Sequence, residues 1–291
     1  MSQILHWFPG HMHKARKELI KILPKIDLVI EVVDSRLPLA SSNPLIEELI
    51  GNKKHLRILS KKDLTDPKIL KEWLNYFDHA IALDIQKDKK SAQQILLKAK
   101  KMLPNRGTIL KPIRAIIVGI PNVGKSSLIN TLVGKKIAKT GNEPAVTKQQ
   151  QNIAITREFF IRDTPGIMSP SPKDEASGFK LAISGAIRDT AMDYPLAAYF
   201  LINYLKEYYP TVILNRYKVN DQTLNDEETL NEIAKKIGAL STDSQANLHR
   251  AAERLILDFR NKRLGNISLE SVEQVKKDQA LLLSDSNNPT T

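Results

Sequence analysis

The hydrophobic positions of the first 165 residues form short apolar runs that alternate with longer amphipathic stretches. Near-continuous apolar runs rich in β-branched residues are typical of strands buried in a parallel sheet. Such runs occur at 26–34, 55–60, 79–84, 114–119, 152–156 and 158–163. In 91–102, apolar residues recur every three or four positions, which predicts a helix with one apolar stripe. Strands alternating with helices predict an α/β domain with a sheet of mostly parallel strands.

The strand pattern stops after about residue 175. Three later stretches, 179–209, 226–238 and 245–263, have patterns that predict helices. We therefore expect an α/β domain over 1–175 and an all-helical domain over 176–275. The final segment, 276–291, ends in LSDSNNPTT and is predicted to be a disordered tail.

The composition excludes several classes of protein. Of the 291 residues, 42% are apolar, which is ordinary for a globular chain. The absence of cysteine excludes a disulfide scaffold, a cysteine-ligated metal site and a catalytic thiol, and it fits a reducing compartment. No apolar run approaches the ~20 residues needed to cross a bilayer, and the first residues do not resemble a secretory signal. We expect a cytoplasmic protein without a membrane partner.

The charge is unevenly distributed along the chain. Lys and Arg exceed Asp and Glu by 44 − 32 = 12. Residues 1–175 hold 30 basic and 17 acidic side chains, whereas the remainder holds 14 and 15. A basic field of this kind favours polyanionic partners, although an ordinary basic surface would have the same composition.

Residues 119–126 read GIPNVGKS and match the phosphate-loop pattern G-x-x-x-x-G-K-[ST] between a predicted strand and a predicted helix. In this pattern the glycines let backbone N–H groups surround the phosphates. Lys125 reaches the β- and γ-phosphates, and the Ser126 hydroxyl binds Mg²⁺. The predicted phosphate contacts are Asn122, Val123, Gly124, Lys125, Ser126 and Ser127.

A second motif, Asp163-Thr164-Pro165-Gly166, follows the last predicted strand. A carboxylate at a strand end can hold Mg²⁺ through a water molecule, as expected of Asp163. The Gly166 amide can contact the γ-phosphate and release it after hydrolysis. Thr147, in the polar stretch between the two motifs, can supply a second hydroxyl to Mg²⁺, or it can be an ordinary loop threonine.

Guanine is distinguished from adenine by a carboxylate that accepts hydrogen bonds from its N1–H and N2 amino group. GTPases place this carboxylate in N-K-x-D, and the chain has Ser60-Lys61-Lys62-Asp63 after the strand at 55–60. Because Ser60 replaces the usual Asn, we expect weaker binding and retained guanine selectivity through Asp63. Leu83 and Asp84 stand where a Ser-Ala pair usually backs the base, so only a backbone amide near them is expected to contact guanine.

These motifs occur in an unusual order, because the base-binding motif precedes the phosphate loop. The parts match a Ras-like P-loop G domain cut open and rejoined elsewhere, which is tolerable because chain termini often lie close together. The Pro-, Asn- and Gly-containing stretch 101–112 is the predicted joint. We therefore predict a circularly permuted G domain followed by a helical domain.

Six stretches carry a resemblance to a known family: WFPGHMHKAR (7–16), VVDSRLPLASSNP (32–44), GIPNVGKSSLIN (119–130), KTGNEPAVTKQQQ (139–151), DTPGI (163–167) and SGAIRDT (184–190). The chain resembles the circularly permuted GTPases of the YlqF/RbgA type, which assemble ribosomes. This resemblance implies GTP hydrolysis with Mg²⁺ on the maturing large (50S) ribosomal subunit, at a late assembly step. It also implies that GTP and GDP control binding, that the helical domain touches rRNA, and that the free protein is a monomer without a DNA partner.

Two further roles come from resemblance. Ile167 stands where Ras-like enzymes have a water-orienting Gln, and the family offers His11 as the catalytic replacement. His6 and His13 lie close by in the sequence, and His11 could instead be structural or face RNA. The loop containing Asn122 resembles those of potassium-stimulated GTPases, which makes Asn122 a candidate K⁺ ligand or a simple turn residue.

Other functions remain open from the residues alone. A P-loop ATPase or kinase would bind ATP at least as well as GTP. A non-hydrolysing RNA-binding chaperone would bind RNA independently of nucleotide. A membrane-linked G protein is disfavoured because the chain has no lipidation motif. In 245–263, Arg250, Arg254 and Asp258 share one helix face, which is either an rRNA contact or a solvated charged surface.

Overall fold

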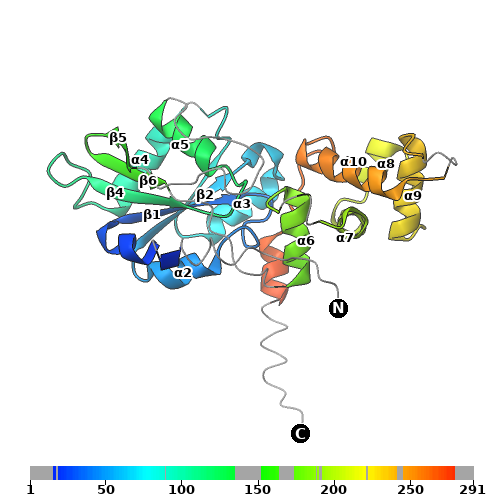
Figure 1. Cartoon of the computed structure of the whole chain (residues 1–291), viewed down its shortest axis with the longest axis horizontal. Helices are drawn as coiled ribbons and strands as arrows, with labels where there is room; N and C mark the ends of the chain where they lie inside the picture. Colours follow the sequence, from blue (N-terminus) through cyan, green and yellow to red (C-terminus); the bar gives the residue numbers. More distant parts are fainter. Residues whose placement is uncertain are drawn as a thin grey trace, which may run out of the picture.

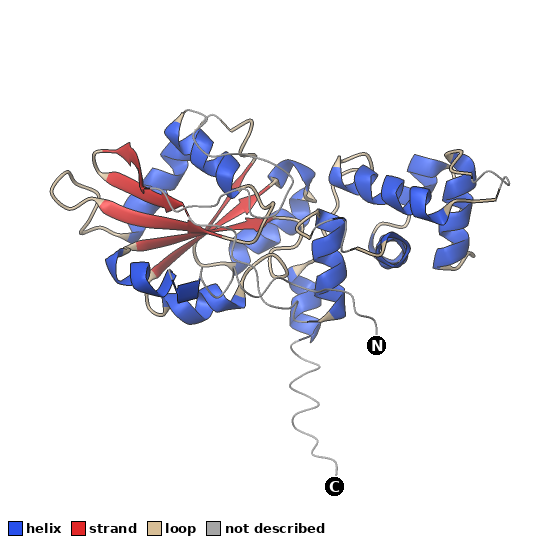
Figure 2. Cartoon of the chain, in the orientation of Figure 1, coloured by secondary structure: helices blue, strands red, loops and turns tan. Residues whose placement is uncertain are grey.

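The computed structural model describes residues 16–134 except 18 and 89, residues 152–163, 174–187 and 189, and residues 192–278 except 221 and 241–244. It has a sheet with helices on both faces at one end and a group of helices at the other (Figures 1 and 2). Hydrogen bonds between residues far apart in the sequence join these two parts, and some of them involve residues of the candidate site.

Within the described residues the sheet has six strands, and all six predicted strands are present within one or two residues. They are β1 (Leu28–Asp34), β2 (Lys54–Ser60), β3 (Ala80–Leu83), β4 (Ile113–Val118), β5 (Asn152–Thr156) and β6 (Phe159–Asp163). Their spatial order is β3-β2-β1-β4-β6-β5. Among these described strands, only the edge pair β5–β6 is antiparallel. The predicted α/β sheet of mostly parallel strands is therefore confirmed.

Helices cover both faces of this sheet. One face packs against α4 (Ser91–Met102) and α5 (Lys125–Val133), and the other against α2 (Pro44–Ile50) and α3 (Pro67–Tyr76). Alternate residues of β1 enter opposite core layers, so every residue of the strand is buried. Burial on two faces explains why the strands are continuous apolar runs. Two short 3₁₀ helices, η1 (Leu23–Lys25) and η2 (Lys62–Leu64), lie in the connections.

The second part of the chain is helical, as predicted. Its helices are α6 (Glu175–Ser184), α7 (Tyr194–Tyr208), α8 (Val212–Tyr217), α9 (Asp226–Lys236) and α10 (Leu248–Arg260). The predicted helical stretch 179–209 is divided in two. Gly185 ends α6 in a left-handed conformation with φ 84°, and Asp193 caps the start of α7 with its side chain.

The end of the described chain returns to the sheet. The backbone amide of Leu269 donates to the Arg36 carbonyl at 2.7 Å. Residues 272–278 are helical, and Val272 and Val275 pack beside Trp73 of α3. Residues 276–278, which we predicted to begin a tail, continue this helix, and 279–291 lie outside the described residues.

Within the described parts of the chain, no helix combines the length and apolarity needed to span a bilayer.

Candidate nucleotide-binding site

The three predicted nucleotide-binding loops meet at one edge of the sheet. The phosphate loop follows β4, the Ser60-Lys61-Lys62-Asp63 loop follows β2, and the Leu83-Asp84 loop follows β3. The parallel strands β4, β1, β2 and β3 are successive neighbours, so their carboxyl ends share this edge. Open α/β sheets bind ligands outside the carboxyl ends of their strands.

The phosphate loop has a backbone that requires glycine at two positions. Gly119 has φ 147°, and a Cβ atom there would lie 2.5 Å from the Val32 carbonyl oxygen. Gly124 has φ 103° and is the N-cap of α5, whose positive end favours an anion. The buried Lys125 Nζ donates to the Ile120 carbonyl at 3.1 Å, within the loop. Six of the seven predicted phosphate contacts lie on this loop or in the first turn of α5, and the seventh, Gly166, lies outside the described residues.

Ser60 connects the base-binding loop to the phosphate loop. Its buried hydroxyl oxygen lies 2.6 Å from the Val123 carbonyl oxygen and 2.8 Å from the Val33 carbonyl oxygen. The hydroxyl donates its one proton to these two carbonyl oxygens. Val123 immediately precedes Gly124, so the contact holds the two loops in register. The replacement of Asn by Ser therefore leaves a side chain that still braces the base-binding loop.

Lys61 leaves β2 in a left-handed conformation with φ 56°. Its Nζ lies 2.8 Å from the Asp34 Oδ2 atom at the end of β1, and Arg36 binds the same carboxylate at 2.7 and 3.0 Å. Burial disfavours the charged form of Asp34, but the Arg36 and Lys61 charges outweigh burial and hold its pKa well below the usual value. This buried ion cluster orients the backbone that leads to Asp63.

Asp63 lies in η2, and its backbone is held from the far end of the chain. The Asn266 side-chain amide donates to the Asp63 carbonyl at 2.9 Å and to the Thr65 carbonyl at 2.8 Å. The Ile267 amide donates to the Leu64 carbonyl at 3.2 Å. Within the described residues the half-buried Asp63 carboxylate has no hydrogen-bond or ion-pair partner. Sequence reasoning missed Asn266, which lies 203 residues from Asp63 and in no recognisable motif.

Asp88 joins the base-binding loop to the loop after β3, and sequence reasoning missed it as well. Its carboxylate accepts from the Asp84 amide at 2.9 Å and lies 2.6 Å from the Lys62 Nζ. Burial raises the pKa of Asp88. The hydrogen bonds from Lys62 and from the Asp84 amide lower it by more, so the pKa of Asp88 is below its usual value. Leu83 is fully buried. The Asp84 amide already donates to the Asp88 carboxylate, so a hydrogen bond from this amide to guanine would compete with that one.

Several predicted site residues cannot be placed. His11, Thr147 and Gly166 lie outside the described residues, as does the side chain of Asp163. The backbone of Asp163 is described, and it pairs with Ile117 of β4. Asp163 is therefore at the same sheet edge as the phosphate loop, which begins two residues after Ile117.

The site also contacts the helical part. The carbonyl end of α6 is held by the Asn122 amide, which donates to the Gly185 carbonyl at 2.8 Å. Arg260 of α10 donates to the Ala182 and Ile183 carbonyls at 2.8 and 2.9 Å. Cationic and amide donors stabilise the negative end of a helix. The phosphate loop and the helical part thus share one hydrogen-bonded junction.

A phosphate loop joined to an aspartate-bearing base loop, on this sheet and in this permuted order, defines a P-loop GTPase. A family model described as a 50S ribosome-binding GTPase matches residues 114–238. Ribosome biogenesis GTPase A of Priestia megaterium is 38% identical over 285 residues, covering 94% of this chain and 99% of the relative. The Bacillus cereus protein of the same name is 39% identical, covering 93% and 95%. The chain belongs to the ribosome biogenesis GTPase A family.

The fold comparison agrees with the predicted permuted G domain. The solved GDP-bound structure of YlqF from T. maritima matches with a TM-score of 0.63 at 23% identity, covering 88% of this chain and 99% of that one. This likeness supports the fold of both the sheet and helical parts.

Proposed function

We propose that this GTPase binds GTP between the phosphate loop and the Asp63 loop and hydrolyses it on the maturing large ribosomal subunit, in the cytoplasm. The observation that carries the proposal is the contact of the Ser60 hydroxyl with the Val123 carbonyl, at 2.6 Å. It joins the loop that reads the base to the loop that holds the phosphates. The names of the relatives and of the matching family supply the ribosomal context.

Roles within the site follow from this placement. Asp63 accepts from guanine, while Lys125 and the backbone amides of 122–127 hold the phosphates. Ser126 lies in the first turn of α5 and Asp163 ends β6 beside β4, and their hydroxyl and carboxylate oxygens are suitable Mg²⁺ donors. Mg²⁺ bound there, with Thr147 as a further ligand, would neutralise charge on the β- and γ-phosphate oxygens. His11 orients the attacking water, and K⁺ on Asn122 is a further candidate ion.

The proposed arrangement is a G domain over 1–175 followed by a helical ribosome-binding domain over 176–275. GTP state would control ribosome binding through the junction at Gly185, because Asn122 belongs to the phosphate loop and also contacts this residue. A nucleotide or ion that draws the Asn122 side chain away would loosen the end of α6. Such a coupling needs two states of one structural element, and α6 is the candidate.

The proposal is tested by measuring GTP and ATP hydrolysis by the purified protein, alone and with isolated large or small ribosomal subunits, in K⁺ and in Na⁺ buffer. We expect slow GTP turnover that only large subunits raise. Lys125→Ala should abolish turnover, whereas Lys101→Ala on the exposed surface of α4 should not change it. His11→Ala should retain GTP binding and lose the stimulation.

Different results would overturn different parts of this proposal. A preference for ATP would indicate a P-loop ATPase or kinase. RNA binding that neither nucleotide nor Lys125→Ala changes, with no GTP turnover, would indicate a non-hydrolysing chaperone. Full stimulation of His11→Ala would remove His11 from catalysis, and equal rates in K⁺ and Na⁺ would remove the K⁺ role of Asn122.

A further inference from the structure

A short segment after α10 lies between the α/β part and the helical part of the molecule. It consists of residues 266–270, which we call the strap, and its last four residues are buried. Successive backbone amides of the strap donate alternately to the two parts. The amides of Ile267 and Leu269 donate to carbonyls of the α/β part, and the Ser268 amide between them donates to a side chain of the helical part. A shift of either part therefore disturbs the contacts of the strap with the other.

On the α/β side, the strap holds the loops that surround the base-binding region. The Asn266 side chain and the Ile267 amide donate to backbone carbonyls of 63–65, in the loop after β2. The Leu269 amide donates to the carbonyl of Arg36, in the loop after β1, at 2.7 Å. The guanidinium of Arg36 belongs to the buried ion cluster that orients the base-binding loop. The position of the strap therefore affects the base-binding loop at two places.

The last residue of the strap, Glu270, is bound by several groups. Its buried carboxylate accepts from the Leu39 amide at 2.8 Å and from the Ala40 amide at 3.1 Å. The Lys180 Nζ atom of α6 lies 3.5 Å from the same carboxylate, and the Trp73 indole donates to the Glu270 carbonyl at 3.2 Å. The middle of the strap is held differently, because among the described residues a single side chain binds its backbone.

That side chain is Tyr209, which directly follows α7. Its hydroxyl oxygen accepts from the Ser268 amide at 3.0 Å, and its proton donates to the Ser268 carbonyl at 3.4 Å. Burial raises the pKa of Tyr209, so the hydroxyl stays neutral and can both accept and donate. The backbone of Tyr209 is fixed in the helical part, because its amide donates to the Leu205 carbonyl and its carbonyl accepts from the Val212 amide. Tyr209 thus ties the middle of the strap to α7.

We propose that Tyr209 is a positioning residue for guanine-nucleotide binding and acts through the strap. Without its hydroxyl, the buried Ser268 amide has no partner, which is unfavourable enough to displace the strap toward another acceptor. The neighbouring donors of the strap would then release the carbonyls of 63–65, and the base would have to reorder this loop. The inference rests on the proposed function, in which Asp63 accepts from guanine. It places a second connection to the helical part on the base side of the nucleotide, whereas Asn122 lies on the phosphate side.

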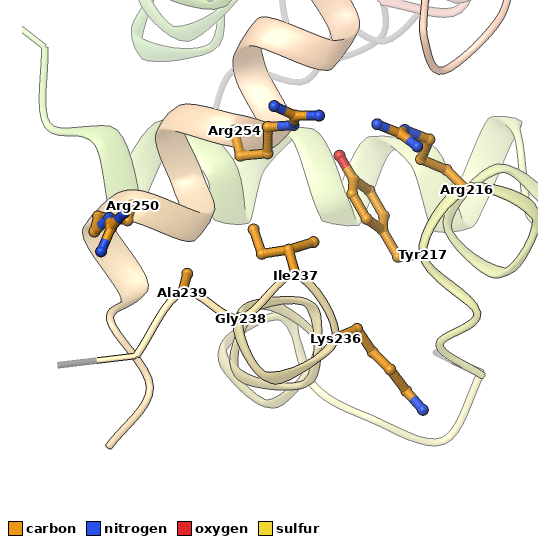
Figure 3. A pocket seen from close by; sticks show the side chains of 8 residues that line it. All are labelled: Arg216, Tyr217, Lys236, Ile237, Gly238, Ala239, Arg250 and Arg254. Carbon is orange, nitrogen blue, oxygen red and sulfur yellow. The ribbon is translucent and has the colours of Figure 1, made fainter. Parts of the chain in front are cut away.

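The test compares Tyr209→Phe with the control Tyr199→Phe in the full-length protein. Both variants lose one tyrosine hydroxyl, and Tyr199 is a half-buried residue of α7 that has no hydrogen bond to the strap among the described residues. The cavity between α8, α9 and α10 is lined by other residues (Figure 3), so neither substitution changes its lining. Titration with a fluorescent GDP analogue gives Kd, and urea unfolding gives the stability. GTP turnover with large ribosomal subunits gives kcat and KM.

We expect Tyr209→Phe to bind GDP about fivefold more weakly, which is the effect of one net hydrogen bond, and Tyr199→Phe to bind as the wild type does. KM for GTP should rise by a similar factor. The value of kcat at saturating GTP should not change, because Lys125 and the phosphate loop are untouched. In a Tyr209→Phe/Asn266→Ala double variant, GDP affinity should be within about twofold of Asn266→Ala alone, because both residues act through the strap.

Two results would overturn the proposal. The first is a Tyr209→Phe protein that is less stable but binds GDP as well as Tyr199→Phe, because Tyr209 would then stabilise only the fold. The second is full additivity of the Tyr209 and Asn266 effects on GDP affinity, because the two residues would then act independently. A wild-type protein that binds neither GDP nor GTP would instead refute the proposed nucleotide site. If large subunits do not raise turnover, the ribosomal part of the proposed function fails, and the GDP affinities still decide the role of Tyr209.

Discussion

The hydrogen bonds of Asn266 predict that guanine-nucleotide affinity depends on a residue outside every recognised motif. Its side-chain amide donates to the Asp63 carbonyl within η2 at 2.9 Å and to the Thr65 carbonyl directly after η2 at 2.8 Å. Asn266→Ala removes both donors. At about 1 kcal/mol for each net hydrogen bond, the folded protein loses about 2 kcal/mol. Part of this loss should appear in nucleotide binding, because the free loop can relax and must be reordered by the base.

If the free loop relaxes completely, nucleotide binding must restore its order, and the binding free energy falls by the whole amount. A loss of about 2 kcal/mol corresponds to roughly a 30-fold increase in Kd. We therefore expect GDP affinity to fall by about 10- to 30-fold. Selectivity for guanine over adenine should remain, because the Asp63 carboxylate is untouched. Asn220→Ala, at an exposed position of the helical part, is the matched control and should bind as the wild type does.

Two measurements separate binding from folding. Titration with a fluorescent GDP analogue gives the affinity, and urea unfolding followed by tryptophan fluorescence gives the stability. Trp73 is fully buried and donates to the Glu270 carbonyl at 3.2 Å, so its emission reports the same chain segment. A loss of about 2 kcal/mol in stability with GDP affinity within twofold of the wild type would refute the reasoning. Asn266 would then stabilise the fold without positioning the base-binding loop.

Three further predictions concern buried polar groups. Ser60→Ala removes the hydroxyl donor to the buried Val33 and Val123 carbonyls, so the unfolding free energy measured in urea should fall by about 1–2 kcal/mol and GDP should bind more weakly. An unchanged GDP affinity would contradict the role of Ser60 in connecting the two loops. The pKa of Asp34 is lowered in the folded protein, so its ionised carboxylate stabilises the fold above the unfolded pKa of about 3.9, and this stability is lost as the pH falls below that value. Asp34→Asn should therefore be less stable at pH 7, and its stability should fall less steeply with decreasing pH. An equally steep fall in this variant would assign the dependence to other carboxylates. Asp258 of α10 is fully buried, and its carboxylate forms ion pairs with Arg216, Arg254 and Arg263 at 2.7, 3.2 and 3.3 Å. Asp258→Asn leaves these guanidinium groups without their counter-charge and should lose about 3 kcal/mol of unfolding free energy, which high salt should partly restore. A loss below about 0.5 kcal/mol would mean that Asp258 does not hold these arginines in place.

The sequence predicted the strands and the phosphate loop because their signals are local. A strand buried on both faces is mostly apolar, and Gly119 and Gly124 occupy backbone conformations that other residues rarely adopt. The order of the motifs also revealed the permutation before any strand order was known. The division of 179–209 into two helices was missed, although Gly185 and Asp193 are the residue types that end and begin helices.

Contacts between distant residues decided the rest. The sequence showed Ser60 as a departure from a motif, and only the neighbouring β1 and phosphate-loop carbonyls give its hydroxyl a bracing role. Likewise, 245–263 showed Arg250, Arg254 and Asp258 on one face, but the opposing Arg216 comes from α8. Asn266 reaches Asp63 across 203 residues of chain. Patterns within one element follow from backbone geometry and solvent exposure, whereas a buried polar contact depends on which two elements pack together, and that is set by the tertiary fold.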